Sequence, residues 1–248
     1  MPEITWIWGM PLVRWTRSRV VDEIVNRIDT CAPTYFVTVN LNYCMLVYRL
    51  CRLYEVNKWA EFLVADGAPL VLMSHWLGLP LPERVTGSDL IYDLGKSAAT
   101  KGHRVFLLGG GAGVAELAAR RLVALYPELI VVGTASPNAE ELHGPGLDDL
   151  RVHIRATRPD ILLVALGQPK GEIWIVDHHE ELGALVSVQV GATLDFVAGR
   201  VRRAPQCVQK LHMEWAYRMC QDPRRLFIRY VNNLMFAIKI IVNEMLEK

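Results

Sequence analysis

The sequence predicts an α/β protein in which helices cover a parallel β-sheet on both faces. Short apolar runs rich in β-branched residues alternate with segments of helical periodicity, which is the pattern of strands joined by crossover helices. Each run is apolar almost throughout, as strands buried on both faces are. The 248 residues are 52% hydrophobic and 21% charged, so the composition is that of a globular protein.

The periodicity assigns the elements in chain order. Strands are expected at residues 35–40, 62–65, 104–108, 130–133, 161–165 and 185–190. Helices are expected at residues 42–56, 68–77, 88–101, 112–125, 138–157 and 171–182, and Ser88 is the expected N-cap of the third. Residues 223–248 predict a further helix that follows the sheet domain.

Charge divides the chain into two parts. Residues 200–230 carry eight Lys and Arg side chains against two acidic ones, net +6, whereas the whole chain is only +1. We therefore expect an α/β domain at residues 1–199 and a basic appendage at residues 200–248. The near-neutral total gives no reason to expect nucleic acid, but the local excess favours anionic lipid or a lipid diphosphate.

The last helix is amphipathic. Its apolar side chains recur at helical spacing, and basic and amide side chains mark the other side, as in helices that lie on a membrane surface. Packing on its own domain or in a homo-oligomer interface is the alternative. Polar residues that include Arg229, Asn232, Asn233, Lys239 and Asn243 interrupt the stretch 226–245, which predicts that it is too polar to span a membrane.

Cysteine and histidine spacing argue against two classes of site. The five cysteines form no C-x-x-C pair, which indicates neither a disulfide framework nor a zinc site and favours a reducing cytoplasm. The seven histidines show no metalloenzyme spacing, and no D-x-D motif provides a carboxylate clamp for a divalent metal. The first residues lack the charge order of a secretory signal. We expect no metal and no cofactor.

Polar or glycine-rich residues follow each predicted strand. Because ligands of open α/β sheets bind beyond the carboxyl ends of the strands, these residues predict one cleft. The candidates at the strand ends are Thr38, Asn40, Asp66, Gly109, Gly110, Gly113, Ser136, Gln168, Lys170 and Asp195.

Residues 109–113 form a glycine-rich turn between a strand and a helix. Such a turn lets backbone N–H groups approach a diphosphate, although it also fits a simple tight turn. Val114 stands where the dinucleotide fingerprint requires its third glycine, and no acidic residue follows the next strand. An NAD(P)-dependent oxidoreductase is therefore disfavoured.

Asp66 follows an apolar run and precedes Gly67, so it is a candidate general base. An N-cap for the next helix is the alternative and, from local sequence alone, the more common role. Thr38 and Asn40 alternate along a strand and need polar partners, which substrate hydroxyls or loops could supply.

Three further side chains suit an anionic, hydroxyl-rich ligand. Arg84 can serve an anion, or pair with Glu83 on the surface. Lys170 is a candidate phosphate contact and Gln168 a candidate reader of hydroxyl groups, unless both are merely solvated loop residues.

Several motifs resemble the WecG/TagA/CpsF family of bacterial glycosyltransferases in order and spacing. They are DGAPLVL at 66–72, LGLPLPERVTGSD at 77–89, FLLGGGAGVAE at 106–116, YPEL at 126–129, PDILLVALGQPK at 159–170, GATLDFVAG at 191–199, RAP at 203–205 and EW at 214–215. The resemblance covers nearly the whole chain, from about residue 7 to residue 230.

This resemblance implies a Rossmann-like, inverting, metal-independent enzyme that transfers a sugar from a UDP-sugar to a polyprenyl-diphosphate-linked sugar in cell-surface polysaccharide synthesis. It implies that Asp66 is the base and that Thr38, Asn40, Arg84 and Gln168 line the active site. It also implies that arginines of the appendage, here Arg218, Arg224 and Arg225, complete the site at the inner face of the cell membrane. A non-catalytic UDP-sugar-binding protein at the membrane is the alternative.

Three positions depart from the family pattern. Gly171 stands in place of the glutamine of P-K-Q-E, Cys207 in place of the tryptophan of R-A-P-x-W, and His212-Met213 in place of the G-L of G-L-E-W. They lie near the implied donor and acceptor regions, which suggests a different sugar specificity.

Overall fold

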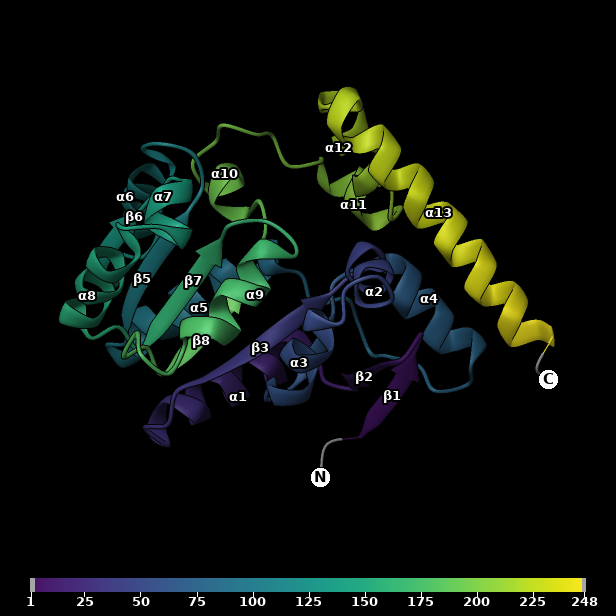
Figure 1. Cartoon of the computed structure of the whole chain (residues 1–248), viewed down its shortest axis with the longest axis horizontal. Helices are drawn as coiled ribbons and strands as arrows, with labels where there is room; N and C mark the ends of the chain where they lie inside the picture. Colours follow the sequence, from purple (N-terminus) through teal and green to yellow (C-terminus); the bar gives the residue numbers. More distant parts are fainter. Residues whose placement is uncertain (1–2, 247–248) are drawn as a thin grey trace.

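A mixed eight-stranded β-sheet forms the centre of the computed structural model, which describes residues 3–246 apart from the side chains of Lys210 and Arg225. The strands lie in the order β1-β2-β4-β3-β8-β7-β5-β6, and only the β1–β2 pair among them is antiparallel (Figure 1). Their bounds are β1 (Ile4–Ile7), β2 (Met10–Val13), β3 (Thr34–Val39), β4 (Leu63–Ala65), β5 (Arg104–Gly109), β6 (Ile130–Ala135), β7 (Ile161–Ala165) and β8 (Val186–Gln189). The predicted α/β class is confirmed, with all six predicted strands present.

Helices connect and cover these strands. Their bounds are α1 (Arg17–Asp29), α2 (Leu41–Val47), α3 (Arg52–Trp59), α4 (Ala68–Trp76), α5 (Gly87–Lys101), α6 (Val114–Leu125), α7 (Ala139–His143), α8 (Leu147–Thr157), α9 (Lys170–His178), α10 (Thr193–Val197), α11 (Gln206–Lys210), α12 (Glu214–Gln221) and α13 (Pro223–Leu246). Every helix predicted from the sequence has a counterpart among them.

Three predicted helix details were wrong. The stretch 42–56 is two helices, α2 and α3, and the stretch 138–157 divides into α7 and α8. The second division follows from Gly144-Pro145-Gly146, because proline lacks an N–H group and glycine favours a turn. The N-cap of α5 is Thr86, not Ser88, and its hydroxyl accepts a hydrogen bond from the backbone N–H of Asp89.

The sequence prediction missed the β1–β2 hairpin and helix α1. The hairpin turns through Trp8 and Gly9, both with positive φ, at 49° and 75°. Positive φ at both central residues is the requirement of a type I′ turn, which matches the twist of paired strands. Asparagine, aspartate or glycine usually marks the first of these positions in a sequence, and tryptophan does not. Helix α1 buries Val20, Val21, Ile24, Val25 and Ile28, a period that the sequence does contain.

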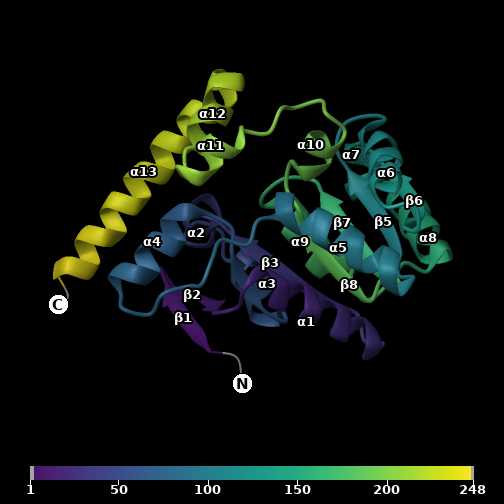
Figure 2. The same cartoon turned by 180° about the vertical axis from the view of Figure 1, so that it is seen from behind.

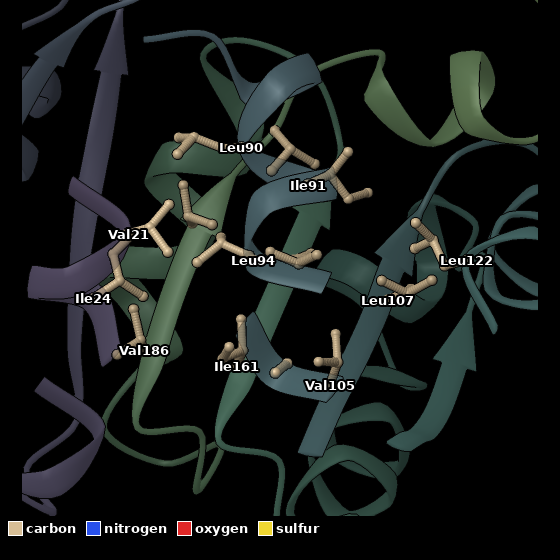
Figure 3. Packing of buried hydrophobic residues seen from close by; sticks show 14 of the residues in the cluster. Val21, Ile24, Leu90, Ile91, Leu94, Val105, Leu107, Leu122, Ile161 and Val186 are labelled. Atoms are coloured by element: carbon tan, nitrogen blue, oxygen red, sulfur yellow. The ribbon is translucent and has the colours of Figure 1, made fainter. Parts of the chain in front are cut away.

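Two hydrophobic clusters lie on the two faces of the sheet. One cluster joins α1, α5 and α6 to alternate strand residues, and Figure 3 shows Ile24, Leu94 and Val105 within it. The other cluster includes Tyr43, Leu53 and Trp174 from α2, α3 and α9. Because strand side chains alternate, neighbours along one strand enter opposite clusters. The sheet is therefore covered on both faces. Because most of its strands are parallel, their carboxyl ends share one edge.

The chain from α11 onward lies beside this edge. Figures 1 and 2 show α11 and α12 set apart from α10, with α13 running past α2 and α4. The ring of Phe236 in α13 packs edge-on against Trp8, at 6.4 Å, and against Tyr48, at 5.3 Å, between ring centroids. The C-terminal helix is thus docked on the N-terminal half of the domain.

The sequence suggested that helix α13 is apolar on one face only. The structure shows apolar side chains on its packed side and on its exposed side. Phe236, Ile240 and Ile241 pack on the second core cluster, whereas many other apolar residues of the helix are exposed. The exposed ones are Phe227, Ile228, Val231, Leu234, Met235, Ile238, Val242, Met245 and Leu246. The segment Leu226–Leu246 is also long and apolar enough to cross a membrane by length and composition, contrary to our prediction, and only 11% of its apolar window is buried in the protein.

Candidate active site

A cavity of about 1360 Å³ lies at the carboxyl ends of the strands. The sheet side of its lining includes Thr38, Asn40, Asp66, Arg84, Gln168, Lys170, Gln189 and Asp195. Its other side comes from α12, α13 and the turns beside them, and includes His212, Glu214, Trp215, Arg218, Arg229, Tyr230 and Asn233. The cavity therefore lies between the α/β domain and the appendage.

Asp66 follows β4 and lines this cavity, where the residue is half-buried. Its backbone N–H donates to the carbonyl of Val39 at 2.7 Å, which continues the pairing of β3 with β4. Burial raises the pKa of the Asp66 carboxyl from 3.8 to about 6, although Arg84 and Arg218 oppose the rise. A carboxylate with a pKa near neutrality can accept a proton and release it again.

The alternative role of Asp66 as a helix cap is not what the structure shows. Gly67 is the N-cap of α4, and no side chain accepts a capping hydrogen bond there. The Asp66 carboxyl group is therefore left for the cavity.

Thr38 and Asn40 already have partners within the protein. The Thr38 hydroxyl donates to the carbonyl of Gln189 at 3.3 Å. The Asn40 Oδ1 atom accepts from the backbone N–H of Tyr43 at 3.0 Å and so caps α2. Both residues still line the cavity, beside Asp66.

Arg84 pairs with the appendage and not with Glu83. Its Nη1 atom lies 3.4 Å from Oε2 of Glu214, at the start of α12. Arg203 lies 3.6 Å from the same carboxylate and 2.7 Å from Asp89. Glu83 instead accepts a hydrogen bond from the backbone N–H of Arg17, so the alternative of a surface pair between Glu83 and Arg84 is wrong. A chain of ion pairs thus joins α5, the cavity wall and the appendage.

The remaining predicted residues divide into those that reach the cavity and those that do not. Gly110, Lys170, Asp195 and Arg218 line it, and Arg218 also lies over the ring of Phe196 at 5.4 Å. The residues outside the lining are Gly109, Gly113, Ser136 and Arg224. The side chain of Arg225 is outside the described part of the structure. Ser136 has a local role, because its hydroxyl donates to the carbonyl of Gly109 at 3.3 Å.

Known proteins share sequence similarity with this chain. The sequence model of the glycosyl transferase WecG/TagA/CpsF family matches residues 5–248. The chain belongs to this family. Among curated relatives, the N-acetylglucosaminyldiphosphoundecaprenol N-acetyl-beta-D-mannosaminyltransferases of Staphylococcus aureus strains MW2, COL and MRSA252 are each 34% identical to it over 177 residues. The aligned part is 69% of this chain and 66% of each relative, slightly under two thirds of the relatives' length.

One departure from the pattern of the WecG/TagA/CpsF family has a structural explanation. A side chain at Gly171 would overlap the carboxamide of Gln189, which packs against the Gly171 backbone in the first turn of α9. Gln189 is buried, and neither polar atom of its side chain has a hydrogen-bond partner among the described residues. An amide from β8 therefore fills the space that a side chain at position 171 would take.

Sequence reasoning missed three residues of this site. Glu214 was noted as an acid within a basic stretch and as part of the EW motif, without a role in the site, yet it pairs with Arg84 and Arg203. Arg200 lines the cavity and donates to the carbonyl of Ala112 in the glycine-rich turn, at 2.7 Å. Glu172 is buried beside Gln168, and burial raises its pKa to about 7. Glu172 stands next to the apolar run Ile173–Val176 in a predicted helix, and this pattern could have identified it as a buried acidic residue.

Among residues 3–246, no three His, Cys, Asp and Glu side chains come together in a way that could hold a metal ion. The cationic side chains of the lining are Lys170, Arg84, Arg200, Arg218 and Arg229. An anionic ligand in this cavity would therefore meet guanidinium and ammonium groups.

Proposed function

We propose that this protein is an inverting glycosyltransferase that moves a sugar from a UDP-sugar to a polyprenyl-diphosphate-linked sugar, without a metal ion. The observation that carries the proposal is the Asp66 carboxyl group, which lines a cavity together with cationic side chains and whose pKa burial raises to about 6. Family membership and the names of the S. aureus relatives, which act on an undecaprenol-linked substrate, support it.

In the proposed reaction, Asp66 takes the proton of an acceptor hydroxyl as that oxygen attacks the anomeric carbon of the donor. The new bond forms on the face opposite UDP, the bond to the UDP oxygen breaks, and the anomeric configuration inverts. General-base catalysis of this kind contributes roughly two to four orders of magnitude in rate. Thr38, Asn40 and Gln168, which share the lining with Asp66, would contact sugar hydroxyl groups.

Departure of UDP leaves negative charge on a diphosphate. Arg84, Lys170 and Arg218 line the cavity and can stabilise this charge in place of a metal ion. The backbone at Gly110 and Gly111 also lines it, next to the start of α6, where N–H groups favour phosphate. The donor diphosphate is therefore assigned to this part of the cavity.

The appendage would bring the site to the lipid-linked acceptor. Residues 1–199 form the catalytic domain in this proposal, and residues 200–248 complete the site and contact the inner face of the membrane. The exposed apolar side chains of α13 support this role, since they continue from the cavity wall at Phe227 and Leu234 to the end of the helix. An apolar helix surface next to basic residues favours a layer of anionic lipid.

The test is a UDP-release assay on purified protein with a panel of UDP-sugars, with and without a short-chain polyprenyl-diphosphate-sugar, in the presence of EDTA. The proposal predicts acceptor-dependent release with one donor that survives EDTA. Measurable UDP binding with no release from any pair would contradict it and favour a non-catalytic UDP-sugar-binding protein.

A further inference from the structure

Gln189 is a buried amide in the wall of the cavity, and its side chain has no hydrogen-bond partner in the described part of the chain. It ends β8, lines the cavity and is 2% exposed. Neither Oε1 nor Nε2 is paired among the described residues, whereas its backbone carbonyl accepts from the hydroxyl of Thr38 at 3.3 Å. An unpaired buried amide destabilises a fold, and an apolar side chain would avoid that cost. The amide therefore indicates a partner that is not part of the chain.

The carboxamide of Gln189 lies against the first turn of α9. Its three heavy atoms are all less than 3.0 Å from the place that a Cβ atom of Gly171 would take, which is closer than real side chains approach. Gln168 and Lys170, at the start of the same turn, also line the cavity. The pattern of the WecG/TagA/CpsF family has a glutamine at position 171. The chain thus keeps an amide in this part of the cavity wall, but it comes from β8 and not from α9.

The order of the strands places Gln189 between the two ends of the proposed reaction. In the order β4-β3-β8-β7-β5, β8 is two strands from β4, which Asp66 follows, and two strands from β5, which the turn at Gly110 and Gly111 follows (Figure 1). Since neighbouring strands are about 4.8 Å apart, β8 lies roughly 10 Å across the sheet from each. The base of the proposed reaction is at β4 and the donor diphosphate is at β5. The donor sugar between them therefore lies over the strands in the middle, where Gln189 is.

We propose that Gln189 determines which donor sugar the cavity accepts, through hydrogen bonds between its carboxamide and a hydroxyl or acetamido group of that sugar. A carboxamide both donates and accepts, so it matches either group. A sugar without the matching group would leave the buried amide unpaired, which is a strong basis for discrimination. The location of the donor sugar rests on the proposed function. The replacement of a side chain at position 171 by the amide of Gln189 rests on packing alone.

The first experiment measures affinity and needs no turnover. Titration calorimetry compares UDP with UDP-glucose, UDP-N-acetylglucosamine and UDP-N-acetylmannosamine. The proteins are the wild type, Gln189→Met, which keeps a similar length without an amide, and Gln206→Met, at an exposed position outside the cavity lining. Gln189→Met should weaken binding of the tightest UDP-sugar about tenfold, leave that of UDP within about twofold, and narrow the spread among the three sugars. Gln206→Met should match the wild type.

The outcomes separate this proposal from the proposed function. Unchanged affinity of Gln189→Met for every UDP-sugar would overturn the proposal and indicate that ordered water satisfies the amide. An equal loss for UDP and for the UDP-sugars would also overturn it, because the amide would then not act on the sugar. A wild type that does not bind UDP would overturn the proposed function, and the assignment of the donor sugar with it.

The second experiment moves the amide back to α9. Gly171→Gln alone should lower the melting temperature, because the new side chain overlaps the Gln189 carboxamide. Gly171→Gln combined with Gln189→Ala should restore the melting temperature, and also the UDP-sugar affinity to within about threefold of the wild type. Gly171→Met with Gln189→Ala is the matched control, which fills the space without an amide and should restore the melting temperature only. Equal UDP-sugar affinity of the two combinations would contradict a role for the amide.

Discussion

The guanidinium group of Arg84 lies 3.4 Å from the carboxylate of Glu214, and this pair joins the cavity wall of the α/β domain to the first residue of α12. Both side chains are mostly buried, at 19% and 16% exposed. Glu214 also raises the pKa of Asp66, while Arg84 lowers it. The appendage therefore acts on the candidate base through charge as well as by covering the cavity.

Glu214→Ala should uncouple the appendage from the site. Without the carboxylate, Arg84 and Arg203 lose a shared partner, and we expect the free energy of unfolding to fall by about 1–3 kcal/mol. The pKa of Asp66 should fall, because a neighbouring negative charge is gone. Urea denaturation and the pH profile of UDP release measure the two effects. Glu180→Ala, which removes an exposed acidic residue after α9, is the control. If the acidic side of the pH profile of Glu214→Ala coincides with that of the wild type, Glu214 does not influence Asp66.

Asp66→Asn should make the fold more stable at neutral pH. The pKa of Asp66 is raised from 3.8 to about 6 in the folded protein. Above pH 6 the folded protein must hold Asp66 in its disfavoured charged form, which lowers the free energy of unfolding, whereas below pH 4 Asp66 is protonated and this cost is absent. This shift corresponds to at most about 3 kcal/mol at 1.36 kcal/mol per pH unit.

The measurement is urea denaturation of Asp66→Asn and the wild type at pH 4 and pH 7.5. The difference should be large at pH 7.5 and nearly absent at pH 4. Asp22→Asn, at an exposed site in α1, corrects for the loss of one charge. A difference that is the same at both pH values would mean that Asp66 ionises as freely in the fold as in the unfolded chain.

Gly171→Ala should destabilise the protein through one neighbour. The new methyl group would meet the Gln189 carboxamide, which is buried and would have to shift within the wall of the cavity. Overpacking of this kind costs about 1–3 kcal/mol. Adding Gln189→Ala should remove most of that cost, so a double-mutant cycle by thermal unfolding checks the pair. If the two costs simply add, Gln189 is not what excludes a side chain at position 171.

The exposed side of α13 should govern binding to lipid. Met235 and Ile238 are 65% and 55% exposed, and burial of each in a membrane is worth about 1.5–3 kcal/mol. Met235→Glu with Ile238→Glu should therefore weaken sedimentation with anionic vesicles at least about tenfold while UDP binding stays intact. Val152→Glu on α8, equally exposed, is the control. Undiminished sedimentation would show that α13 does not face the lipid.

The sequence predicted the sheet domain well because strands that are covered on both faces are apolar throughout. Residues 161–165, for example, were assigned within their observed bounds. It missed the β1–β2 hairpin because Trp8 occupies a turn position that glycine or asparagine normally signals. The sequence also predicted one helix where the structure has the pair α2 and α3, and one helix where it has the pair α7 and α8. The break between α7 and α8 carries a Gly-Pro-Gly signal that the prediction did not use.

For the site, strand ends predicted the sheet side of the cavity but not the partners of its residues. Asp66, Thr38, Asn40, Arg84 and Gln168 all line it, as strand-end residues of one sheet edge should. The pairing of Arg84 with Glu214 joins residues 130 positions apart, and no local pattern reports such a contact. Tertiary packing of the appendage decided it.

The most direct test of the account is acceptor-dependent UDP release by Asp66→Asn against the wild type, with UDP affinity measured on the same samples. The account predicts that turnover falls roughly two to four orders of magnitude while UDP binds nearly as before, because the base is lost and the donor contacts remain. It also predicts that wild-type turnover rises with pH through about 6, as Asp66 loses its proton. Normal turnover by Asp66→Asn would contradict the account.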